Sequence, residues 1–160
     1  MITRRVALLA CGALVFGGLG AAPARADEIA LNGVYTAVSD GQWAKTNERF
    51  EERPALISTW TISSTCQSYL DCTGRVDSDH GWSADLTYRS GYWWVSHTVP
   101  EWLKCRDGAT FPGKQGFQFW PDRSNPIALT GWDKTVGPSG ACGVNRWVTI
   151  EMPFTLTPVG

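Results

Sequence analysis

The chain has 160 residues, nine of them tryptophan, and a formal net charge of −1 at pH 7. Residues 27–160 hold 11 basic and 15 acidic side chains, and the basic ones do not cluster along the chain. A mildly acidic chain without a basic patch is a poor partner for nucleic acids or for anionic membrane surfaces.

Residues 1–26 predict a cleavable signal peptide. Two arginines at positions 4 and 5 precede an uncharged run over Val6–Ala22, and Ala24-Arg25-Ala26 has the small-x-small form that signal peptidase reads. We therefore expect cleavage before Asp27 and an exported protein, secreted or retained in the cell envelope, with no transmembrane segment after cleavage. The arginine pair leaves both the general and the twin-arginine export routes open.

The predicted mature chain holds four cysteines, an even number that indicates two disulfides in an oxidising compartment. The stretch "CQSYLDC" brackets a loop that a hairpin would close, so we pair Cys66 with Cys72 and Cys105 with Cys142. Four cysteines allow two other pairings as well. No Cys-x-x-Cys occurs and the histidines are not at ligand spacing, so we predict no metal site and no cofactor.

Glycine and proline recur between short stretches rich in β-branched and aromatic residues, a pattern typical of all-β domains. In chain order, Asp40-Gly41 within "GVYTAVSDGQW" predicts a two-residue hairpin turn. The alternative is a short helix that Ser39 and Gln42 cap and that runs to Phe50.

Further strands are expected at 55–66, 72–78, 81–89, 92–99, 116–120, 127–136 and 146–156. In the last of these, apolar and polar residues alternate, and Pro153 predicts a sheet edge or a bulge because it lacks a backbone N–H. About eight antiparallel strands in one domain, residues 27–160, predict an up-and-down barrel of the lipocalin or calycin kind. A two-sheet sandwich is the alternative.

The stretch "YRSGYWWVSHTV" predicts one hairpin of this barrel, with Ser90-Gly91 as its turn. That register places Tyr88 opposite Trp93, Leu86 opposite Val95, Ala84 opposite His97 and Trp82 opposite Val99. This nearly apolar face is expected to point inward, because burying each large side chain is worth about 2 kcal/mol.

His97 is the polar member of the inward face, and it predicts a binding site inside the barrel. A small apolar or amphipathic molecule would lie against Trp82, Leu86, Trp93 and Val95, oriented by the imidazole. The alternative is a structural histidine that bonds to a neighbouring group or reaches water at the rim.

The outward face of the same hairpin carries Tyr92 and Trp94 beside Arg89 and Asp85. Exposed aromatics next to hydrogen-bonding groups stack on sugar rings or anchor protein partners, which predicts a surface interaction module for an envelope glycan or protein. The alternative is that a loop or a terminal segment covers them.

The segment "DSDHGWSAD" brings serine, histidine and aspartate together in sequence. In the predicted hairpin, however, Ser83 and Asp85 lie on the outward face while His80 lies in the preceding turn. No Gly-x-Ser-x-Gly elbow occurs either. We therefore predict a non-enzymatic protein with no catalytic residues.

Six segments, "SDGQWAKTNE", "STWTISSTC", "DCTGRV", "GWSADL", "VGPSGACG" and "WVTIEMPF", resemble small exported four-cysteine proteins of unknown function from mycobacteria and related actinobacteria. The resemblance covers almost the whole mature chain. It implies an envelope or extracellular location, and it implies no activity and no site residue.

Overall fold

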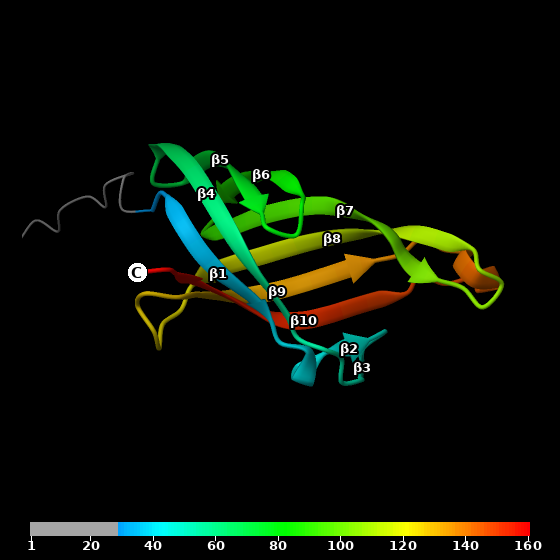
Figure 1. Cartoon of the computed structure of the whole chain (residues 1–160). Coiled ribbons are helices and arrows are strands. Elements are labelled where there is room, and N and C mark those ends of the chain that lie inside the picture. Colours follow the sequence, from blue (N-terminus) through cyan, green and yellow to red (C-terminus); the bar gives the residue numbers. More distant parts are fainter. Residues whose placement is uncertain (1–28) are drawn as a thin grey trace, which may run out of the picture.

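A computed structural model of the chain describes residues 29–160. The predicted signal peptide and its cleavage site lie outside the described residues. Within them the chain is almost entirely β-structure, with two single-turn 3₁₀ helices, η2 (Gly41–Trp43) and η3 (Ala141–Gly143) (Figure 1). None of the helices in this described part is long and apolar enough to cross a membrane.

The strands pair antiparallel in a single sheet. They are β1 (Gly33–Ser39), β2 (Lys45–Thr46), β3 (Arg49–Phe50), β4 (Leu56–Ser68), β5 (Asp71–Ser78), β6 (Ser83–Arg89), β7 (Tyr92–Lys104), β8 (Thr110–Pro121), β9 (Leu129–Val136) and β10 (Thr149–Pro158).

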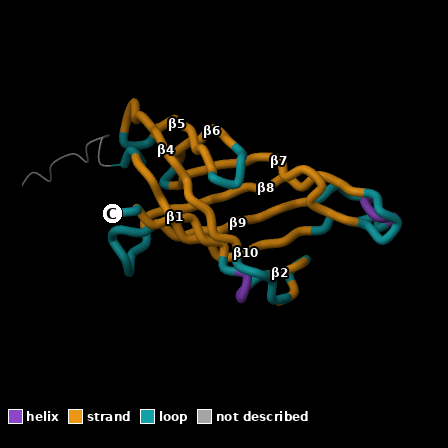
Figure 2. The backbone as a smooth tube through the Cα atoms, in the orientation of Figure 1, coloured by secondary structure: helices purple, strands orange, loops and turns teal. Residues whose placement is uncertain are grey.

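Eight of these strands form a closed barrel. From β4 to β10 each strand pairs with the next one along the chain, and β1 pairs with both β4 and β10, which closes the sheet on itself. The strands wrap around a common axis, and the small β2–β3 hairpin extends the sheet beyond β10 (Figure 2). The predicted all-β, up-and-down barrel of about eight strands is confirmed.

The predicted β6–β7 hairpin is confirmed from its turn, Ser90-Gly91, as far as Leu86 and Val95. Beyond these residues the two strands separate, so the predicted pairs of Ala84 with His97 and of Trp82 with Val99 are wrong. The pairing sets Leu86 opposite Val95 and Tyr88 opposite Trp93. Ser90 and Gly91 have φ of 54° and 88°, the left-handed conformation that a tight two-residue hairpin turn needs at both positions. The face predicted to be apolar points inward.

Large side chains fill the middle of the barrel. Trp60 is at its centre, in contact with the rings of Phe117 and Phe154 at centroid distances of 4.9 and 5.3 Å. The buried cluster comprises Tyr35, Ala37, Trp60, Ile62, Cys72, Val76, Ala84, Leu86, Trp93, Val95, Phe117, Phe119, Leu129, Phe154 and Leu156. The core therefore draws on every strand of the barrel.

Neither prediction for Asp40-Gly41 is correct. Strand β1 ends at Ser39, and the Asp40 carboxylate accepts a hydrogen bond from the backbone N–H of Gln42 (3.0 Å), which caps η2. Gly41 is buried so tightly that a Cβ there would lie 2.0 Å from the carbonyl oxygen of Arg53. This contact with a segment twelve residues away overrides the local turn preference.

Pro153 lies neither at an edge nor at a bulge, contrary to the prediction. Strand β10 has partners on both sides, and Pro153 faces Trp132 of β9. Its carbonyl accepts from the N–H of Asp40 (2.8 Å), at the point where β10 changes partner from β2 to β1. The N–H that proline lacks would point to the same side as this carbonyl, into the gap between the two partner strands.

Both predicted disulfides are present. Cys66 and Cys72 face each other across β4 and β5, and Cys105, after β7, is bonded to Cys142 in η3. The second disulfide ties the far end of the long β7–β8 hairpin to the loop between β9 and β10.

Candidate functional site

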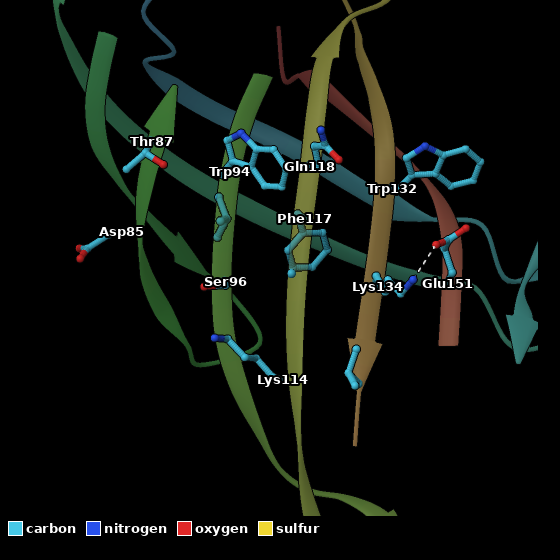
Figure 3. Close-up of a pocket in the computed structure, with 13 residues that line it drawn as sticks. Asp85, Thr87, Trp94, Ser96, Lys114, Phe117, Gln118, Trp132, Lys134 and Glu151 are labelled. Atoms are coloured by element: carbon cyan, nitrogen blue, oxygen red, sulfur yellow. Dashed lines mark ion pairs between the residues drawn. The ribbon is translucent and has the colours of Figure 1, made fainter. Parts of the chain in front are cut away.

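A groove of about 640 Å³ lies on the outer surface of the barrel, over the outward faces of β6 to β10 (Figure 3). Most of the residues that line it stand at alternating, outward positions of neighbouring strands, while Val95 and Phe117 on its lining belong to the buried core. Its lining residues are Asp85, Thr87, Trp94, Val95, Ser96, Lys114, Gly116, Phe117, Gln118, Trp132, Lys134, Val136 and Glu151.

The register of the sheet produces this groove. Trp94, Gln118 and Trp132 are direct cross-strand partners on β7, β8 and β9, so they form one row across the sheet. In the next row Gly116 lies between Ser96 and Lys134. A Cβ at Gly116 would have only the carbonyl oxygen of Val95 nearby, at 3.9 Å, so the missing side chain leaves open space at the floor.

Two exposed tryptophans flank the middle of the groove. Trp94 is 45% exposed and Trp132 is 41% exposed, one on each side of β8. Neighbouring strands are about 4.8 Å apart, which places the two backbones roughly 10 Å apart. Tyr92 extends the aromatic surface, because its ring contacts Trp94 at 6.4 Å and Trp120 at 5.5 Å.

The rim of the groove carries charges of both signs. Lys134 pairs with Glu151 at 3.4 Å, as the dashed line in Figure 3 marks. Lys114 and Asp85 lie farther along the same surface, and Asp85 pairs with Arg75 at 3.6 Å. The groove therefore offers aromatic faces in the middle and hydrogen-bonding groups of both kinds around them.

The predicted surface residues divide into two groups. Asp85 and Trp94 line the groove, and Tyr92, which is 40% exposed, borders it through Trp94. Arg89 is exposed opposite Tyr92 at the hairpin end and does not line the groove. No described segment covers Tyr92 or Trp94. The sequence analysis did not identify Trp132 as a site residue. Its position in "LTGWDKTV" is out of phase with the inward residues, which indicates the outer face.

The predicted interior residues also divide. Leu86, Trp93 and Val95 are at most 3% exposed and belong to the buried core cluster. Trp82 and His97 lie nearer one end of the barrel, where their rings stack at 4.0 Å. The Nε2 atom of His97 is 2.9 Å from the side-chain oxygen of Gln115, which is the neighbouring partner that a structural histidine requires.

His97 is the first member of a polar chain that crosses the barrel interior. The side-chain nitrogen of Gln115 donates to both carboxylate oxygens of Asp133, at 2.8 and 2.9 Å. The hydroxyl of Ser39 donates to the same carboxylate at 2.7 Å. Sequence reasoning missed Ser39, Gln115 and Asp133, although Asp133 stands in phase with buried Leu129 on a predicted strand.

Burial shifts the pKa values at both ends of this chain. Desolvation raises the pKa of Asp133, and the hydrogen bonds from Ser39 and Gln115 offset part of the effect. Desolvation lowers the pKa of His97, and the contacts with Gln115 and the Thr98 backbone act in the opposite direction. In both groups burial favours the neutral form.

Two small cavities adjoin the polar chain, with volumes of about 100 Å³ and about 40 Å³. At the opposite end of the barrel a pocket of about 260 Å³ opens beside Tyr88 and Trp93, under the N-terminal residues Ile29 and Leu31. The barrel interior thus has cavities at its two ends, and the buried cluster around Trp60 lies between them.

The sequence-adjacent serine, histidine and aspartate do not form a relay. The hydroxyl of Ser83 donates to Asp77 rather than to His80, and all three residues are exposed. Among residues 29–160 no group of three or more His, Cys, Asp or Glu side chains could hold a metal ion.

Comparison with known proteins finds likeness among solved structures. No family model matches the chain, and no curated protein matches it. Among solved structures, the monomer form of the PknI sensor domain of M. tuberculosis superposes with a TM-score of 0.59 over 82% of this chain and 89% of that chain. The two chains share a fold. Their sequence identity is 12%, so the likeness extends to the fold alone.

Proposed function

We propose that the chain is an exported, non-enzymatic binding domain, and that it binds an envelope glycan in the outer groove. The observation that carries the proposal is the pair of exposed indoles, Trp94 and Trp132, on either side of an open floor at Gly116. The structural neighbour is named as a sensor domain, which is in keeping with a binding role.

The chemistry of the groove suits a saccharide. A sugar ring has an apolar face of C–H bonds, which stacks on an indole, and an edge of hydroxyls, which needs donors and acceptors. Gln118 lies between the two indoles, and Lys134 with Glu151 provides an ion pair beside them. The volume of about 640 Å³ falls within the range of about 300 to 1,000 Å³ that ligand pockets occupy.

A small apolar or amphipathic ligand inside the barrel is the competing function. It would need open space beside Leu86 and Val95, and both side chains belong to the buried cluster in the middle of the barrel, whereas Trp93 of the same cluster also lines the pocket at one end. The cavities near His97 are each about 100 Å³ or less, which is under the volume of about 300 Å³ at which pockets for drug-sized ligands begin, so they have room only for a molecule of a few heavy atoms. A larger pocket, of about 260 Å³, lies at the opposite end.

The test is a titration of the purified protein, followed by calorimetry and tryptophan fluorescence. The probes are soluble glucan, galactan, arabinan and peptidoglycan fragments, and in a separate arm an envelope lipid extract. We expect saturable binding of at least one saccharide and none of the lipid. Binding of the lipid alone would support a ligand site inside the barrel. Absence of binding to both the saccharides and the lipid would overturn the glycan proposal.

Three variants locate the site. Trp94→Ala and Trp132→Ala should each weaken glycan binding by about tenfold or more, because truncating a central aromatic anchor of a binding surface typically costs about 2 kcal/mol. Gly116→Leu should abolish binding by filling the floor, where a side chain has room. Trp147→Ala is the matched control, because Trp147 is 65% exposed but lies outside the groove. Equal losses in the control and the groove variants would contradict the assignment.

A further inference from the structure

The carboxylate of Asp133 is buried without a cation. The residue is 3% exposed, and its three hydrogen bonds come from the neutral side chains of Gln115 and Ser39. None of the four ion pairs found among residues 29–160 involves Asp133. Buried charges in proteins are normally paired, because an isolated buried carboxylate is costly.

His97 does not supply the missing charge. Its hydrogen bond goes to Gln115 rather than to Asp133, so a neutral amide separates the two titratable groups. Burial lowers the pKa of His97, which favours a neutral ring at pH 7. Its Nδ1 atom is buried without a hydrogen bond of good geometry among the described residues.

The cavity of about 100 Å³ beside Asp133, hereafter the end cavity, has one polar wall. That wall consists of Gln115, Asp133 and Thr135, and the other walls are the apolar side chains of Leu56, Val99, Trp102, Ile150 and Met152. An engineered apolar cavity of about 150 Å³ admits benzene, so a cavity of this size accommodates a molecule of a few heavy atoms. The indole of Trp102 is a favourable wall for a cation.

The backbone near the end cavity departs from regular strand geometry and leaves room for Trp102. The pairing of β7 with β8 shifts register between Val99 and Leu103, and Glu101 has φ of 49°. Trp102 packs where two glycines leave room, since a Cβ at Gly113 would lie 2.7 Å from its ring and a Cβ at Gly137 2.9 Å. Leu56, which is 45% exposed, also lines the cavity and connects it to the surface.

We propose that the end cavity is a second binding site, which takes a small primary alkylammonium ion with its head group on Asp133 and its carbon chain against the apolar walls. The ammonium donates to the carboxylate and to the hydroxyl of Thr135 and completes the ion pair that the chain itself lacks. This proposal is independent of the glycan proposal, because Asp133 and Leu56 lie outside the outer groove.

The test uses propylammonium chloride as the probe and thermal unfolding of the purified protein as the readout. A ligand that binds the folded state alone raises the melting temperature in a concentration-dependent way. We expect propylammonium to raise it at pH 7, and sodium chloride at equal ionic strength and 1-propanol, which has the same carbon chain, to leave it unchanged. An equal response to 1-propanol, or no response to propylammonium, would overturn the proposal.

Two variants complete the test. Asp133→Asn should weaken the affinity for propylammonium, obtained from the concentration dependence of the melting temperature, by about ten- to a hundredfold. The reason is that a hydrogen bond to a charged group is worth about 1.5–3 kcal/mol. Leu56→Trp enlarges a half-exposed residue at the entrance and leaves every hydrogen-bonding side chain of the polar chain in place, so it should fold and bind propylammonium more weakly. A full response in a folded Asp133→Asn protein, or in Leu56→Trp, would contradict the site. Leu70→Trp, at an exposed turn outside the end cavity, is the matched control.

Discussion

Burial couples the stability of the protein to the ionisation of His97. The folded state holds this group with a pKa below the ordinary 6.5, so between the lowered value and 6.5 the unfolded chain binds more protons than the folded one. The stabilising contribution is therefore complete above 6.5 and is lost as the pH falls through the folded-state pKa. Asp133 acts in the opposite sense, because its raised pKa adds stability below 3.8 that is lost as the pH rises through the raised value.

The variant His97→Phe isolates this effect. Phenylalanine retains an aromatic ring to stack on Trp82 but does not titrate. As the pH falls from 7 to 5, the free energy of unfolding of the original protein should decrease relative to that of the variant, by at most about 1.4 kcal/mol per pH unit for one proton. Urea denaturation at several pH values measures it. A difference that stays constant over this range would show that the imidazole is not held neutral by burial.

At the residue scale, the sequence predicted which side chains are buried better than it predicted their roles. Leu86, Trp93 and Val95 were placed inward because strict alternation from a tight turn leaves one choice of face. Their role as core rather than as a ligand site depends on how side chains from other strands fill the space between them. The partners of His97 come from β8 and beyond, and alternation within one hairpin does not identify them.

At the scale of the elements, the β6–β7 hairpin could be predicted because a local turn joins its strands. The segment between β1 and β4 could not. Ser90-Gly91 closes β6–β7 through local backbone preferences. Asp40-Gly41 carries an equally strong local signal, yet Gly41 packs against the carbonyl of Arg53 and begins a 3₁₀ helix. The actual turn of the next hairpin is Asn47-Glu48, both with positive φ, and Asn47 also accepts from the N–H of Thr149.

The two disulfides should differ in what they contribute. Cys105–Cys142 closes 37 residues of chain and Cys66–Cys72 closes 6. The chain-entropy estimate is about 4 kcal/mol for the longer loop and about 2 kcal/mol for the shorter one. Replacing both cysteines of a pair by serine should therefore lower the free energy of unfolding more for Cys105–Cys142, as urea denaturation would measure. A larger loss for the short pair would mean that local strand pairing, rather than loop closure, sets the contribution.

At the scale of the whole molecule, the packed middle of the barrel supports the proposal that the glycan site lies on the outer surface. Strand number and closure followed from alternation and turn spacing, because antiparallel strands with short connections pair in chain order. The groove could not be predicted in this way, because it requires Trp94, Gln118 and Trp132 to align on three strands and Gly116 to leave the floor open. This register depends on how β7, β8 and β9 pair, including the register shift between Val99 and Leu103, and alternation within a single strand does not reveal it.

The most direct test of the account follows the indole N–H signals of the tryptophans by ¹H–¹⁵N NMR during titration with the saccharide that binds best. Trp94 and Trp132 flank the proposed site, whereas Trp60 is buried at the centre of the core and its indole N–H donates to Ser58. Binding in the outer groove should shift the signals of Trp94 and Trp132 with the ligand, while that of Trp60 stays in place. Shifts of Trp60 and Trp93 with unchanged Trp94 and Trp132 would place the ligand inside the barrel and contradict binding in the outer groove.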